Sequence, residues 1–449
     1  MHTMTNLISA PLSGRNKVNV TQVIDGSKYN SFNLRVAVVC FLVIVCDGID
    51  NALFGALLPA IMADMKIGPA EAGILASIGH VGAVGGAIIF GVVADAVGRK
   101  RIMLIGMTLF ILFTAACGLA QGVVDFAIYR FIAGFGLAGV IPIAVALVFE
   151  YTPGKWKAMA SSVSYTGMSG GVLLAALLSI AFLPTVGWRA ILLGTIVFIL
   201  LIPIAFVWVP ESMSTLVKKG KSESIRKVLR KADPQLVPDI NDEYGLQEKP
   251  TARVPLKRLF QGEYARNTVL LGIGMFCLTM IAITLTTWIA QLMVQRGHSL
   301  TTGITFIVVF TSSNFISTPL AGWMSGRMGY KKVFAIYMPL LFISISLIGV
   351  VQDPVVAMIC MFFAGFSTTG AVSILLPYVG SLYPMSFRSS AMGVIYAIGR
   401  IGPIIGSAVA GFMLASEISV PIVLVCMAAP SLVALVAFLL VKEISLQSI

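Results

Sequence analysis

Two aspartates and one arginine lie inside long apolar stretches of this sequence, where charged side chains are rare. Asp47 and Asp50 fall within residues 36–61, and Arg400 falls within residues 389–414. A charge at mid-membrane costs roughly 2.5–3.5 kcal/mol on insertion scales, so such residues usually face a cavity and act on an ion or a solute. Burial favours the neutral form of a carboxyl group, whereas the planar guanidinium of arginine stays charged and matches a carboxylate. We therefore predict proton coupling at Asp47 and Asp50 and binding of an organic anion at Arg400.

Asp47 and Arg400 are predicted to lie at nearly the same depth. Each is about 12 residues from the start of its apolar stretch, which is about 18 Å at the helical rise of 1.5 Å per residue. That depth is close to the middle of a hydrocarbon core about 30 Å thick. The two residues can therefore meet at one site. A permanent salt bridge between Arg400 and Asp47 or Asp50, without transport chemistry, is the alternative interpretation.

Weaker candidates surround these charges. His80 could relay protons to Asp50, since a histidine titrates near neutral pH, although a hydrogen-bonded packing histidine is an equal alternative. Asn314 and Thr369 also fall near mid-depth and could donate hydrogen bonds to a bound solute, or simply bond between helices. Aromatic rings at similar depth could stack on a flat ligand or serve only for packing; these are Phe135 and Tyr396.

The apolar stretches form a series of twelve. The chain has 449 residues, of which 58% are hydrophobic and 11% charged, against roughly 25% charged in a soluble domain. About 20 apolar residues cross a bilayer as a helix, the form in which a single segment satisfies its own backbone in lipid. We therefore predict an all-α membrane protein with twelve transmembrane helices, at residues 36–61, 72–94, 102–121, 125–150, 158–183, 187–209, 267–294, 302–326, 332–350, 354–381, 389–414 and 419–441.

Basic residues are distributed by topology. Of the 31 Lys and Arg residues, 26 fall in the tails and alternate loops that share one side of the membrane. The positive-inside rule predicts that this side, with both termini, is cytoplasmic, in a bacterial inner membrane. The net charge of +12 therefore needs no nucleic-acid partner to explain it.

The chain is built from two halves of one plan. Residues 91–101 and 132–135 recur 231 residues later, as 322–332 and 363–366. Such repeats predict two six-helix halves with a binding site between them near the midplane. At the same offset Asp47 corresponds to Leu278 and Arg400 to Ser169, so these charges are not part of the shared architecture. The predicted divisions are an N-terminal tail 1–35, a first half 36–209, a cytoplasmic linker 210–266, a second half 267–441 and a tail 442–449.

The long linker is polar and is expected to be a solvated tether with a short helix at Ser222–Lys231. Charges at the cytoplasmic helix ends could clasp the two halves in one state and release them in the other. The alternative is that they only set topology. The gating candidates are Asp95, Arg99, Glu150 and Arg327.

Four of these segments carry a resemblance. Gly91-Val-Val-Ala-Asp95-Ala-Val-Gly98-Arg99-Lys100-Arg101 and Arg130-Phe-Ile-Ala-Gly134-Phe-Gly136 resemble signature motifs of the major facilitator superfamily. Asp47-Gly-Ile-Asp50 and Gly399-Arg400-Ile-Gly402 resemble the aromatic acid:H⁺ symporter family within it. The resemblance implies import of a benzoate-type carboxylate with protons by alternating access, with Arg400 on the carboxylate. It also implies a monomer.

Other classes of function have less support. The sequence carries no P-loop, no dinucleotide fingerprint and no HExxH, and its three histidines and six cysteines have no metal-ligand spacing. We therefore expect no cofactor, no metal and no enzymatic activity. The open alternatives are symport of another organic anion, such as muconate, quinate, nicotinate or a dicarboxylate, and proton-driven export.

Overall fold

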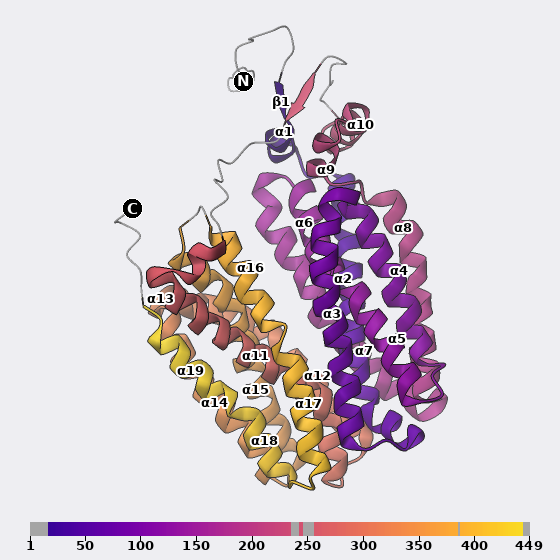
Figure 1. Cartoon of the computed structure of the whole chain (residues 1–449), viewed down its shortest axis with the longest axis vertical. Coiled ribbons are helices and arrows are strands. Elements are labelled where there is room, and N and C mark those ends of the chain that lie inside the picture. The colour runs from indigo at the N-terminus through magenta and orange to yellow at the C-terminus, as the bar shows by residue number, and fades with distance from the viewer. Residues whose placement is uncertain (1–16, 235–241, 246–255, 385–386, 443–449) are drawn as a thin grey trace.

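The computed structural model describes residues 17–234, 242–245, 256–384 and 387–442. It is almost entirely helical, and Figure 1 shows two helix bundles that converge at the end opposite the chain termini and diverge towards them. The helices of the first half are α2 (Ser31–Met65), α3 (Pro69–Val97), α4 (Arg99–Cys117), α5 (Val123–Leu137), α6 (Val140–Tyr151), α7 (Lys157–Gly194) and α8 (Leu201–Trp208). Those of the second half are α11 (Gly262–Gln295), α12 (Leu300–Ser312), α13 (Asn314–Met328), α14 (Tyr330–Val350), α15 (Pro354–Leu382), α16 (Arg388–Gly399), α17 (Gly402–Ala415), α18 (Val420–Ala428) and α19 (Pro430–Leu440).

Eleven helical segments of the described residues are long and apolar enough to cross a membrane, and one of them contains two crossings. That segment runs for 50 residues, Met159–Trp208, about twice what one crossing needs. Gly187 interrupts it with φ 74°. Both ends lie beside the start of the first half, because Lys157 pairs with Asp25 and Arg35 lies over the Trp208 ring. The segment therefore folds back as a hairpin, and the predicted twelve-helix fold is confirmed.

The repeat seen in the sequence has a structural counterpart. Gly98 separates α3 from α4 with φ 122°, and Gly329, 231 residues later, separates α13 from α14 with φ 84°. Positive φ is a conformation that glycine adopts at little cost. The same tight turn thus connects corresponding helices in both halves.

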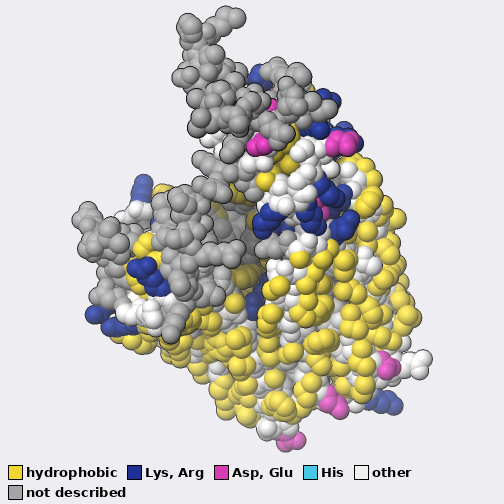
Figure 2. Space-filling model, turned by 45° about the horizontal axis from the view of Figure 1, so that its top comes forward, with side chains coloured by type: hydrophobic (Ala, Val, Ile, Leu, Met, Phe, Trp, Pro, Cys, Tyr) yellow, Lys and Arg dark blue, Asp and Glu magenta, His cyan; other side chains and the backbone are white. Residues whose placement is uncertain are grey.

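The lateral surface is apolar, as expected where helices face lipid. Figure 2 shows hydrophobic side chains covering the visible flank and Lys and Arg side chains gathered near the end that carries the termini. Large residues on this surface are strongly exposed, among them Val92, Val207 and Val350. Exposed apolar area on this scale marks a membrane surface rather than a water-facing one.

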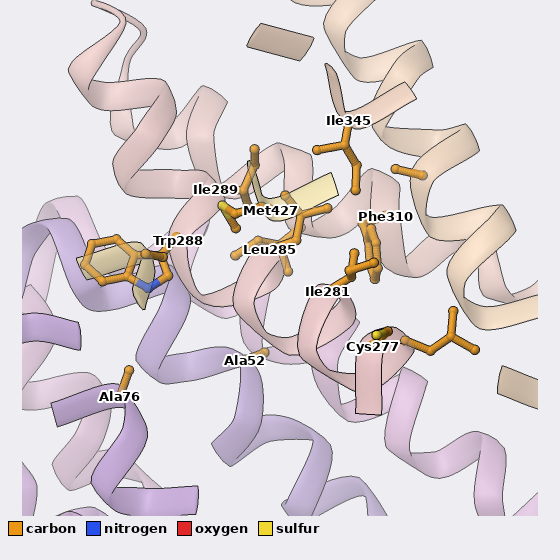
Figure 3. Close-up of a cluster of buried hydrophobic side chains, with 14 of the residues drawn as sticks. Ala52, Ala76, Cys277, Ile281, Leu285, Trp288, Ile289, Phe310, Ile345 and Met427 are labelled. Atoms are coloured by element: carbon orange, nitrogen blue, oxygen red, sulfur yellow. The ribbon is translucent and has the colours of Figure 1, made fainter. Parts of the chain in front are cut away.

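A buried apolar cluster joins the halves at the convergent end. Ala52 of α2 and Ala76 of α3 belong to the same cluster as Leu285 and Trp288 of α11 (Figure 3). Small residues let the backbones approach. The backbones of α17 and α3 are close enough that a Cβ added at Gly411 of α17 would lie 2.5 Å from the carbonyl oxygen of Pro69, at the start of α3.

The segments before α2 and after α8 pack on the first half at the end that carries the termini. They comprise β1 (Lys17–Asn19), α1 (Val20–Gly26), α9 (Met213–Lys218), α10 (Ser222–Ala232) and β2 (Glu243–Gly245), with β1 and β2 paired in parallel. The predicted helix at Ser222–Lys231 is confirmed by α10. The expectation of a solvated tether is wrong for these residues, because α10 buries Ile225 and Leu229, and Asn30 donates to the carbonyls of Lys231 and Ala232.

Candidate functional site

A cavity of about 270 Å³ lies between the two halves. Its lining includes predicted site residues from both: Asp47, Asp50, His80, Asn314, Thr369, Tyr396 and Arg400. Ligand sites are commonly concave, mostly apolar, and furnished with a few convergent polar groups. The residues singled out in the sequence are therefore brought together, with the exceptions given below.

Arg400 stands at a break between two helices. It ends α16, and Pro403 at the start of α17 has no N–H with which to reach the carbonyl of Gly399. Thr279 of α11 donates to that carbonyl instead, at 2.5 Å. The dihedral angles of Arg400 and Ile401 stay in the α-helical region, so the break is a local loss of helical hydrogen bonding at Pro403. The break thus places Arg400 at the cavity wall.

The guanidinium of Arg400 lies on an aromatic ring. Its central carbon is 5.3 Å from the centroid of the Tyr396 ring, and its Nη2 is 3.5 Å from the Tyr396 hydroxyl. The first distance is within the range for a cation–π contact, and the second is at the outer limit for a hydrogen bond. Tyr396 therefore restricts the orientation of the arginine fork, which is suited to bind an anion such as a carboxylate.

Asp50 is held in an ion pair within the first half. Its two carboxylate oxygens accept from Arg130 Nη1 at 2.9 and 3.0 Å, and Thr114 Oγ1 donates to one of them at 2.8 Å. Arg130 in turn lies over the Phe54 ring, 5.1 Å from its centroid. The charge of Asp50 is therefore matched by Arg130. Arg130 is not among the residues predicted for the site, although it lies inside an apolar stretch, which is the same signal that identifies Arg400.

Asp47 is in a different environment. The residue is 3% exposed, and its Oδ2 is buried without a hydrogen-bond partner among the described residues. The charges of Arg400 and Asp50 both act on its carboxyl group. A buried carboxylate oxygen without a partner is costly, so the protonation state of Asp47 is sensitive to whatever else binds near it.

His80 also lines the cavity, in electrostatic range of both Arg130 and Arg400. Its role as a proton relay stays a prediction.

Asn314, Thr369 and Ser169 form a polar group on another part of the lining. Asn314 begins α13 directly after the break at Ser313. Thr369 of α15 donates to Asn314 Oδ1 at 2.6 Å, and Asn314 Nδ2 is 3.3 Å from Ser169 Oγ of α7. This chain of bonds crosses from the second half to the first. Ser169 was identified in the sequence only as the counterpart of Arg400.

Phe135 is not among the residues that line this cavity. Its ring packs edge-on against Phe90 of α3, with centroids 5.0 Å apart. The contact joins α5 to α3 within the first half, so we leave Phe135 out of the proposed site.

The three gating candidates whose side chains the structure describes form no contact between the two halves in this conformation. Arg99 Nη1 pairs with Glu150 Oε1 at 2.6 Å, and Ser212 Oγ donates to the same carboxylate at 2.7 Å. These bonds join α4, α6 and the linker on one half. Arg327 lies over the Trp323 ring of its own helix. The side chain of Asp95 lies outside what the structure describes, and gating by these residues stays a prediction.

Comparison with known proteins places these features in a family. The sequence matches the model described as Major Facilitator Superfamily over residues 40–317 and 304–447. It is 31% identical over 435 residues to the benzoate transport protein of Acinetobacter baylyi, covering 95% of this chain and 93% of that one. It is 28% identical to the 4-hydroxybenzoate transporter PcaK of Pseudomonas putida (87% and 88% covered) and 28% identical to the niacin transporter NiaP of A. baylyi (83% and 85%).

The fold is similar to that of a solved transporter. The inward open conformation of the xylose transporter XylE from E. coli superposes with a TM-score of 0.72, covering 92% of this chain and 98% of that one. The sequences are 17% identical, so the likeness concerns the fold alone.

Proposed function

This chain belongs to the major facilitator superfamily, in its aromatic acid:H⁺ symporter family, and on that premise we propose that it imports an aromatic carboxylate together with protons. Its relatives include transporters of benzoate and 4-hydroxybenzoate, and its fold is that of a transporter and not of an enzyme. The observation that carries the proposal is one cavity holding both a cation for a carboxylate, Arg400 on Tyr396, and a buried carboxyl group with an unmatched oxygen, Asp47.

The mechanism follows from these two groups. While Asp47 is ionised, the charge of Arg400 stabilises it across the cavity. Protonation of Asp47 removes that stabilisation and leaves the guanidinium fork available to the carboxylate of the substrate. The loaded site then carries a matched ion pair, which lowers the cost of enclosing it in a low-dielectric interior. The two halves rock about the site and open it on the other side of the membrane.

The direction of opening follows from the distribution of basic residues. We place both termini in the cytoplasm of an inner-membrane protein, because 26 of the 31 Lys and Arg residues fall on their side. The halves converge at the opposite end, where Ser77 Oγ of α3 donates to the carbonyl of Ile404 in the second half at 2.8 Å. On this orientation the conformation is closed to the periplasm and faces inward.

The test is uptake into proteoliposomes with and without an imposed inward proton gradient. The panel contains benzoate, hydroxybenzoates, protocatechuate and nicotinate, with muconate, quinate and a dicarboxylate as non-aromatic acids. Gradient-driven uptake of an aromatic acid would support the proposal. Uptake confined to a non-aromatic acid, or stimulated only by an outward gradient, would overturn it in favour of another anion or of export.

Asp47→Asn is expected to abolish accumulation while leaving exchange. The asparagine side chain has the shape of the protonated carboxyl group but exchanges no proton, so gradient-driven uptake should fall at least about tenfold. Exchange of labelled for unlabelled substrate needs no net proton movement and should persist. Both are measured in the same vesicles, and full gradient stimulation in this variant would remove Asp47 from the coupling step.

Gly411→Val is expected to favour the state that is open to the periplasm. A Cβ at this position would lie 2.5 Å from the carbonyl oxygen of Pro69 and 2.8 Å from the Cα of Gly73. Overpacking of this kind typically destabilises the packed state by about 1–3 kcal/mol. Labelling of a Ser77→Cys reporter by an impermeant maleimide should therefore rise at least about fivefold. Gly322→Val, at a glycine with nothing within 4 Å, is the matched control and should leave the labelling rate unchanged.

A further inference from the structure

The polar group Ser169, Asn314 and Thr369 lies on the same cavity as Arg400 but is not used by the coupling mechanism. Resting on the proposed function, we infer that these three residues form a subsite for a hydroxyl group on the ring of the transported acid. The geometry points to a hydroxybenzoate as the preferred substrate, ahead of a pyridine carboxylate and of unsubstituted benzoate.

The orientation of the Asn314 amide carries the inference. An amide has an acceptor oxygen and a donor nitrogen with two hydrogens, and its partners decide which end faces a ligand. Thr369 Oγ1 donates to Asn314 Oδ1 at 2.6 Å, which occupies the acceptor end. The NH₂ group is therefore turned towards Ser169 and can offer a hydrogen to a second acceptor.

The bond between Asn314 Nδ2 and Ser169 Oγ leaves room for a better arrangement. At 3.3 Å it is longer than the 2.9–3.0 Å common for N–H···O bonds. A phenolic oxygen that enters as these two groups move apart can accept from the Asn314 NH₂ group and donate to Ser169 Oγ at once. A ring nitrogen can only accept, and an unsubstituted ring can do neither. The order of preference follows from this count of bonds.

The position of the break in the helix supports a role in recognition. Asn314 directly follows the interruption between α12 and α13, where Ser313 Oγ donates to the carbonyl of Phe310 at 2.6 Å. Its half-buried side chain lines the cavity, as the side chain of Arg400 does. A substrate would be held by its carboxylate at Arg400 and by its hydroxyl at Asn314 and Ser169.

Such a hydroxyl would also contact both halves. Ser169 belongs to α7 of the first half, whereas Asn314 and Thr369 belong to the second. The ring substituent would thus replace a weak bond between the halves with a bridge through the substrate. Selectivity and closure of the site would then depend on the same atoms.

The experiment measures competition against uptake of labelled benzoate in proteoliposomes. The competitors are unlabelled benzoate, 3- and 4-hydroxybenzoate, and nicotinate. In the wild type we expect the best hydroxybenzoate isomer to compete at about tenfold lower concentration than benzoate, with nicotinate between them. In Asn314→Leu and Ser169→Ala this ratio should fall to within about twofold, and Thr369→Val, which frees the amide to rotate, should give an intermediate ratio.

Thr368→Val is the matched control. It removes the same hydroxyl from the neighbouring residue, but that hydroxyl donates to the carbonyl of Ala364 at 2.6 Å. The ratio should remain that of the wild type.

Two results would overturn the inference alone. One is a wild-type protein that takes benzoate as well as every hydroxybenzoate isomer. The other is an Asn314→Leu protein in which both affinities fall together and the ratio is kept. In either case benzoate uptake shows that the proposed function stands. Absence of uptake of any aromatic acid would instead overturn the proposed function and the inference with it.

Discussion

Arg400→Ala should lower gradient-driven uptake of the aromatic acid by about 100-fold or more. Removing one partner of a buried, hydrogen-bonded charge pair costs about 2–5 kcal/mol, and a factor of ten corresponds to about 1.4 kcal/mol. In this cavity the loss falls on the substrate, because its carboxylate would enter a buried site without a cation to pair with. Uptake kinetics in proteoliposomes, at matched protein content, measure the effect.

Two further variants separate charge from geometry. Arg400→Lys keeps the positive charge but loses the planar fork and its fit on the Tyr396 ring, so we expect an intermediate loss of about tenfold. Arg35→Ala removes an arginine from an aromatic ring as well, but on the surface at Trp208, outside the cavity. It should keep uptake within about twofold. Near-normal uptake by Arg400→Ala would exclude Arg400 as the carboxylate ligand.

Breaking the pair of Asp50 and Arg130 should mainly affect folding. Both side chains are at most 10% exposed, and truncating one partner of a buried pair typically destabilises a protein by about 3–5 kcal/mol, because the other charge is left buried. Asp50→Ala and Arg130→Ala should each lower the midpoint of thermal unfolding in detergent and reduce the yield of monodisperse protein.

The double variant decides between a structural and a functional role. Asp50→Leu combined with Arg130→Met replaces both charges with apolar groups of similar size, which is often neutral for stability. If the pair is structural, the double variant should regain most of the wild-type unfolding midpoint. A double variant that is as unstable as either single one would contradict this account. A stable double variant without uptake would give the pair a part in transport.

Much of the fold could be predicted from the sequence, because lipid allows few solutions for an apolar segment. The stretch predicted at 354–381, for example, is a helix from Pro354 to Leu382, with Asp353 as its N-cap. Asp353 Oδ1 accepts from the backbone N–H of Val355 and Val356, so the signal for the start was already in the sequence.

Packing of the linker could also have been predicted. Ile225, Val228, Leu229 and Ala232 follow the spacing of one helix face, and all four are buried in the structure. The expectation of a solvated tether rested on the polar composition of the segment and did not take this apolar face into account. The solvated face of α10 accounts for its charge, and the apolar face accounts for its attachment to the first half.

The pairing within the site could not be predicted in the same way. Asp50 and Arg130 are 80 residues apart, and depth along a helix does not say which way a side chain points. On depth alone, Arg400 was therefore as good a candidate as Arg130 for the partner of Asp50. The break beside Arg400 was foreshadowed by Pro403, since a proline cannot bond to the carbonyl four residues earlier, but the compensating Thr279 comes from another helix.

The matching of Asp50 by Arg130 has a consequence for the response to membrane voltage. With that pair neutral, the cavity retains one negative group, Asp47, and one positive group, Arg400. They cancel in the empty site; in the loaded site, a protonated Asp47 is neutral and a monocarboxylate cancels Arg400. Moving one elementary charge across a membrane potential of 100 mV changes its free energy by about 2.3 kcal/mol. The membrane potential does no work on a site that carries no net charge in either direction. The pH difference alone, and not the electrical potential, would therefore drive a cycle of one proton and one monocarboxylate.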